Sequence, residues 1–138
     1  MKKIAILTLG LSLFANAHFL TFLSNTDNVT DQKQTKIDFD ISFIHPFEQS
    51  GMNMEKPEIF VNNKENKLVL TETKKFDHKS WKSSYEIKTP DVYKFFVQPQ
   101  PYFEPSEEKF ISHVPKLIIS SFGLEDGWDE PLGLKYEI

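Results

Sequence analysis

Apolar and polar residues alternate along residues 36–43 of this chain, Lys-Ile-Asp-Phe-Asp-Ile-Ser-Phe. Every second side chain is a large hydrophobe, and the residues between them are charged or polar. A period of two places successive side chains on opposite faces of a strand. The segment therefore predicts a strand with one face in the core and the other in water.

Two further regions predict hairpins. The apolar runs at residues 59–61 and 68–70 are separated by a loop rich in Asn, Lys and Glu. The runs at 85–89 and 92–97 flank a turn signal, Pro90-Asp91. Each pair is expected to form two neighbouring antiparallel strands.

The second half of the chain alternates between turn-rich and apolar stretches. Residues 98–109 hold three prolines, which predicts an irregular surface segment with at most one helical turn at 105–109. Residues 117–122 resume a buried strand, and 125–133 form a turn cluster. Short strands separated by turns, with no strong helix pattern, predict an all-β protein with an antiparallel β-sandwich.

The first residues predict an exported protein. Lys2 and Lys3 precede an eleven-residue apolar run, and the small residues Ala15 and Ala17 fit a signal-peptidase site. The run is shorter than the about 20 residues of a membrane-spanning helix. We therefore expect a cleaved signal peptide at 1–17 and a periplasmic single domain at 18–138, without stable membrane insertion. The last residues resemble a strand that has just begun, which predicts either a missing continuation or a naturally short version.

Composition excludes several classes of function. Loss of Lys2 and Lys3 with the signal would lower the net charge from −4 to −6, so no basic surface for nucleic acid is expected. The absence of cysteine excludes disulfides, thiolate metal sites and thiol nucleophiles. No nucleophile elbow and no glycine-rich phosphate loop occurs, which argues against an enzyme.

Candidate metal ligands gather after the alternating strand. His45 is followed by Glu48, Met52 and Met54 in a segment whose Pro46 and Gly51 predict a loop. Imidazole suits nickel, cobalt, copper and zinc, and thioether sulfur favours copper(I). The alternative is that both methionines pack in the core and His45 caps the strand end.

The other three histidines differ in how well they suit a role as metal ligands. Cleavage after Ala17 would make His18 the first residue, which offers an ion both its α-amine and its imidazole; affinity would then fall in acid, because the amine must lose its proton. His113, among apolar neighbours, is either a ligand or a hydrogen-bonded structural residue. His78, in a charged stretch, is expected at the surface. Trp81 and Trp128 are expected in the core, and Tyr102 and Phe103 at the surface.

Four stretches together resemble a known family. They are HF after the signal, HPFE…MNMEKPEIFV, PQPYFEPSEEKFISHVPKLII and EDGWDEPLGLKYEI. The mature chain is similar to the periplasmic proteins called domain of unknown function 4198, often described as components of a nickel/cobalt transport system of the energy-coupling-factor type. The sequence departs from the family pattern in two places. It stops at Ile138, where related proteins usually continue, and it has Val-Pro after His113, where a threonine before the lysine is expected.

The resemblance implies a transthyretin-like (prealbumin-like) sandwich that handles nickel or cobalt for a membrane transporter. By position, it implies metal ligands at His18, His45, Met52, Met54, Glu104 and His113.

Three other functions remain open. One is a periplasmic copper carrier with an N-terminal histidine site. Another is a copper oxidase in which two histidines hold the ion. The third is a binding or interaction module that holds no metal.

Overall fold

The computed structural model describes residues 18–45, 47–104 and 108–134. The expected signal peptide at 1–17 lies outside these residues, as do most of the expected helical turn at 105–109 and the end of the chain at 135–138. Within the described residues the regular elements are strands, and no helix is present. The all-β prediction is therefore confirmed.

The first sheet is entirely antiparallel, with the strand order β1-β3-β8-β7. A fifth strand, β4, pairs with the far end of β3, beyond the residues that β8 occupies. The bounds are β1 (Phe19–Ser24), β3 (Lys36–His45), β4 (Ser50–Met52), β7 (Thr71–Lys75) and β8 (His78–Glu86).

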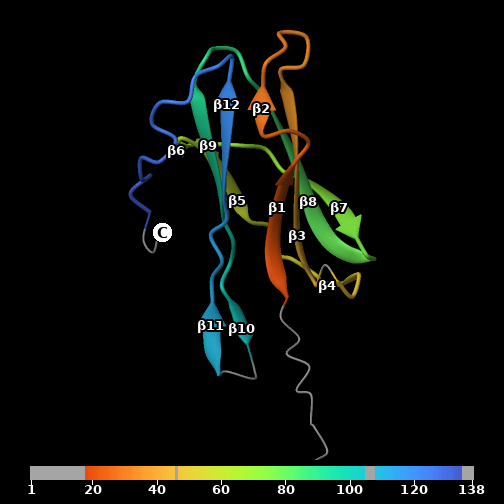
Figure 1. Cartoon of the computed structure of the whole chain (residues 1–138). Coiled ribbons are helices and arrows are strands. Elements are labelled where there is room, and N and C mark those ends of the chain that lie inside the picture. Colours follow the sequence, from red (N-terminus) through yellow and green to blue (C-terminus); the bar gives the residue numbers. More distant parts are fainter. Residues whose placement is uncertain (1–17, 46, 105–107, 135–138) are drawn as a thin grey trace, which may run out of the picture.

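The second sheet has the order β2-β12-β9-β5-β6, and only the short β2–β12 pairing is parallel among the described strands. Its bounds are β2 (Asn28–Val29), β5 (Glu58–Val61), β6 (Asn63–Lys67), β9 (Val92–Gln98) and β12 (Lys116–Ser121). A separate hairpin, β10 (Tyr102–Glu104) with β11 (Lys109–Ile111), connects β9 to β12. Figure 1 shows this hairpin projecting past the end of the second sheet.

The two sheets pack face to face through aromatic side chains. Phe39 of β3 lies with its ring centroid 4.7 Å from that of Phe95 in β9. Tyr85 of β8 contacts the same phenylalanine at 5.3 Å. These contacts cross from one sheet to the other, so the core of a β-sandwich lies between them. Aromatic pairs at such distances add to the stabilisation from burial.

The alternating segment forms β3 as predicted. Ile37, Phe39 and Ile41 are buried, whereas Lys36 and Asp38 are exposed. The buried residues face β9, and the same alternation carries Phe43 and His45 onto this inner face. The inner face of β3 thus runs from the core to the end of the sheet.

The structure corrects both hairpin predictions. The partner of β5 is β6, which begins directly after Asn62, and residues 68–70 follow it without being a strand. All five residues of β6 are exposed, so this edge strand carries no hydrophobic pattern that sequence reasoning could use. Strands β8 and β9 do not pair, because the turn at Pro90-Asp91 carries the chain from one sheet to the other.

The proline-rich segment also differs from prediction. Its prolines at 99 and 101 precede β10, so the strands themselves keep their hydrogen-bond donors. Trp128 is 58 % exposed in the turn cluster rather than buried. Residues 132–134, expected to begin a strand, have no regular structure. The run at 117–122 does form the predicted strand, β12.

Candidate functional site

His18 and His45 lie opposite each other at the end of the first sheet. The register of β1 and β3 pairs Phe19 with Ile44, and one further step sets His18 against His45. Cross-strand partners share one face of a sheet, so both imidazoles lie on the inner face. Their ring centroids are 6.2 Å apart, with the ring planes at 76°.

This separation fits two imidazoles that share one ion. A nitrogen at about 2.0 Å from the ion puts each ring centroid about 3 Å away, so centroids lie about 6 Å apart when the two rings bind from opposite sides. The observed 6.2 Å would accommodate one ion between the two rings when each turns a nitrogen toward it.

An aromatic layer separates this pair from a third histidine. The ring of Phe43 stacks 6.0 Å from His18 and 6.0 Å from His113, which follows β11. Tyr102 of β10 contacts both Phe43, at 4.8 Å, and His113, at 6.2 Å. The projecting hairpin therefore leans against the end of the first sheet.

Hydrogen bonds show which ring nitrogen of His45 and of His113 acts as an acceptor. The backbone N–H of Leu20 donates to Nδ1 of His113 at 3.4 Å, and that of Glu48 donates to Nδ1 of His45 at 3.3 Å. In the neutral rings the proton then sits on Nε2. Burial lowers the pKa of His113 below its usual 6.5, which favours this neutral form.

The two methionines occupy different environments on one strand end. Met52 is opposite Phe43 in the β3–β4 register and is 42 % exposed, whereas Met54 is only 6 % exposed and belongs to the core cluster. Together with His113 they line one pocket of about 130 Å³, whose other walls include Leu20 and Phe43.

Glu104 lies in β10, where it faces Lys109 across the hairpin and accepts a hydrogen bond from the Tyr102 hydroxyl at 3.3 Å. It does not line the pocket. The candidate ligands thus form two groups, the His18–His45 pair and the methionine pocket, with Glu104 apart from both. Among residues 18–45, 47–104 and 108–134, no three His, Asp or Glu side chains are grouped so that they could hold an ion by themselves.

Sequence reasoning missed two residues that organise this region. Phe43 links both groups of candidate ligands, and Tyr102, expected at the surface, is half-buried against it. The alternation of β3 did signal that Phe43 shares a face with His45. No sequence signal placed the hairpin beside them.

The fold and the site define an all-β sandwich protein with an imidazole pair at one end of its inner face. The chain belongs to the family described as "Domain of unknown function (DUF4198)", whose model matches residues 15–138. No curated protein and no solved structure matches the chain. In the part of the chain that the structure describes, no helix is long and apolar enough to cross a membrane.

Proposed function

We propose that the chain is an exported, non-catalytic protein of the periplasm that binds a nickel or cobalt ion and presents it to a membrane transporter. The observation that carries this proposal is the 6.2 Å separation of His18 and His45 across the β1–β3 ladder. Imidazole nitrogens suit both ions. The resemblance of the sequence to nickel/cobalt transport components supports the choice of cargo.

Signal cleavage after Ala17 would complete the donor set. His18 would then carry a free α-amine, and that amine and its own imidazole can bind one ion together. With His45, three nitrogens would hold the ion, while its remaining positions stay open. Open positions suit a carrier, because an acceptor can bind the ion before the protein releases it.

Glu48 can support His45 as a ligand. Binding through Nε2 moves the proton of the ring to Nδ1, where the Glu48 backbone N–H can no longer donate to it. The carboxylate Oε2 of Glu48 lies 3.9 Å from this same nitrogen and would accept a hydrogen bond from its N–H once the side chain moves closer. A ligating histidine commonly donates its second N–H to a carboxylate in this way.

Copper(II) is the second candidate cargo. A site of nitrogen donors binds copper(II) more tightly than nickel or cobalt by intrinsic affinity. Two imidazoles bound from opposite sides of an ion would also fit the tetragonal geometry that copper(II) prefers. Competition between the ions decides between the two carrier functions.

The test is a calorimetric titration of Ni(II), Co(II) and Cu(II) into the chain that begins at His18. A matched control carries one extra alanine before His18, and a second control carries His45→Gln. We expect tight binding of one ion to the first protein and strong weakening in both controls. Bound ion should also raise the melting temperature, since a ligand at 100 times its Kd stabilises the folded state by about 2.7 kcal/mol.

Equal binding by all three proteins would refute the site. Absence of binding in all three would refute the carrier function and favour an interaction module without metal. Nickel or cobalt that stays bound in the presence of an equal concentration of copper(II) would exclude the copper carrier, because nitrogen donors by themselves favour copper(II).

A further inference from the structure

The pocket beside the imidazole pair has an unusual set of donors. Met52 and Met54 contribute thioether sulfur, and His113 contributes an imidazole that burial keeps neutral. The remaining walls are mostly apolar, with Leu20 and Phe43 among them. The two thioethers are soft ligands, the imidazole is a borderline one and none of the three carries a charge, a set in which the sulfurs favour copper(I) over divalent nickel, cobalt or zinc.

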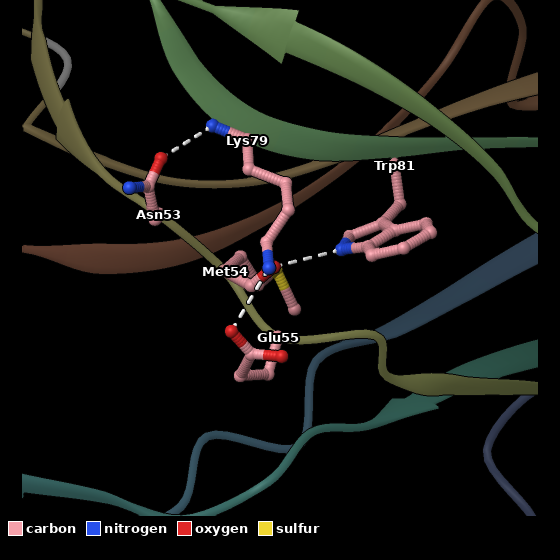
Figure 2. A network of polar contacts seen from close by, with 5 residues as sticks. All are labelled: Asn53, Met54, Glu55, Lys79 and Trp81. Atoms are coloured by element: carbon pink, nitrogen blue, oxygen red, sulfur yellow. Dashed lines mark hydrogen bonds and ion pairs between the residues drawn. The ribbon is translucent and has the colours of Figure 1, made fainter.

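The harder donors of the same pocket are already bound elsewhere. The Asn53 side-chain oxygen accepts the backbone N–H of Lys79 at 2.8 Å. The Glu55 carboxylate accepts from the Lys79 ammonium at 2.9 Å. Figure 2 shows both side chains turned to Lys79. Of the other two polar wall residues, Gln100 is exposed, and the Tyr102 hydroxyl donates to the Glu104 carboxylate at 3.3 Å. Sulfur and imidazole are therefore the donors best placed to serve an ion here.

The backbone that carries the methionines is held in place. The N–H of Met54 donates to the Lys79 carbonyl at 3.0 Å, and its carbonyl accepts the indole N–H of Trp81 at 3.0 Å in a buried bond (Figure 2). Met52 is fixed by its pairing with Phe43 in the β3–β4 ladder. A methionine side chain is flexible, so a fixed backbone keeps the two residues at the pocket wall while their thioethers can turn to an ion.

We propose that Met52, Met54 and His113 form a site for one soft monovalent cation, copper(I), separate from the His18–His45 pair. The site is independent of the proposed function, because it shares no ligand with that pair. The Phe43 ring contacts imidazoles of both groups and links them.

The hydrogen bond of His113 must change when an ion binds. Coordination through Nε2 moves the ring proton to Nδ1 and ends the bond from the Leu20 N–H. This bond is 3.4 Å long, beyond the usual 2.7–3.2 Å, so its loss costs little. The Leu20 N–H lies on β1, a strand at one edge of the first sheet. Its amide signal therefore reports occupancy of the site.

The test uses the protein purified after export. Silver(I), which has the same soft character without redox chemistry, is titrated while the Met52 and Met54 methyl signals and the Leu20 amide signal are followed by NMR. Copper(I) affinity is measured without oxygen against a chromogenic copper(I) chelator. The variants are Met52→Leu with Met54→Leu, which nearly conserves volume, and His113→Gln, with His78→Gln as its matched control outside the pocket.

We expect one equivalent of silver(I) to shift both methyl signals and the Leu20 amide. The double methionine variant should lose more than the about 10–100-fold in affinity that removal of an outer-shell partner costs at metal sites. His113→Gln should weaken copper(I) binding, whereas His78→Gln and His45→Gln should leave it unchanged. Unshifted methyl signals, or copper(I) binding abolished by His45→Gln but not by the methionine variant, would overturn the proposal.

Discussion

Replacement of Trp81 by phenylalanine tests how the methionine segment is held. The substitution keeps an aromatic ring in the core but removes the N–H that donates to the Met54 carbonyl at 3.0 Å. That carbonyl is then left buried without this donor, which costs about 1–3 kcal/mol. The smaller ring also buries less apolar surface, which costs about 1 kcal/mol more. The expected loss in the free energy of unfolding is about 2–4 kcal/mol.

A loss of this size is readily measured. A domain of this length melts about 4 °C lower for each kcal/mol lost, so Trp81→Phe should melt about 8–16 °C lower than the parent chain. Urea unfolding followed by circular dichroism gives the free energy directly. Trp128→Phe is the matched control, because Trp128 is exposed and its replacement should change stability by no more than about 0.5 kcal/mol.

Hydrogen exchange gives the local result. The amide of Met54 donates to the Lys79 carbonyl beside the lost bond, so its exchange should accelerate more than that of the central β3 amides. If Trp81→Phe lowers the free energy of unfolding no more than Trp128→Phe does, the hydrogen bond from the indole N–H does not hold the segment around Met54 in place. If stability falls but exchange at Met54 is not faster, the smaller volume of the phenylalanine ring, and not the lost hydrogen bond, causes the destabilisation.

Three further changes have calculable effects. Gly51→Ala would put a Cβ 3.1 Å from the Phe43 carbonyl oxygen, so the backbones of β3 and β4 must shift by a few tenths of an ångström; urea unfolding should show a loss of about 1 kcal/mol. Phe39→Ala should lose about 3–5 kcal/mol because this side chain is 2 % exposed between the sheets, whereas Val69→Ala, at a residue 85 % exposed, should change little in the same assay. The folded-state pKa of His113 lies below 6.5, so the unfolded chain binds more protons as the pH falls below that value and stability is lost; His113→Gln should remove this part of the pH dependence in urea titrations from pH 8 to 5.

The strands that sequence reasoning found are those that bury apolar side chains on one face or on both. The alternation in β3 and the apolar run in β12 both reflect direct burial against the opposite sheet. Strand β6, exposed along its whole length, left no such pattern. The hairpin of β10 and β11 was hidden by prolines that lie just outside its strands. Hydrophobic patterns in the sequence reflect burial of side chains. Strand β6 and the β10–β11 hairpin are instead stabilised by backbone pairing with a neighbouring strand, which leaves no such pattern.

The candidate site could be predicted only residue by residue. His18 and His45 were both recognised as possible ligands, but they lie 27 positions apart in the chain, and only the register of β1 with β3 sets them opposite each other. The grouping of Met54 with His113 depends on how the hairpin leans against the first sheet. Trp128 was wrongly expected in the core, because composition cannot show which aromatic residues the sandwich leaves outside.

The most direct test of the account is a double-mutant cycle of nickel affinity at His18 and His45. The chain that begins at His18, its His18→Ala and His45→Ala variants and the double variant are titrated with Ni(II) at one pH. If both rings bind one ion, each single change should weaken binding strongly, and the double variant should bind much more tightly than the sum of the two losses predicts. Losses that simply add would show that the two imidazoles act separately, and would contradict the shared site at the end of the β1–β3 ladder.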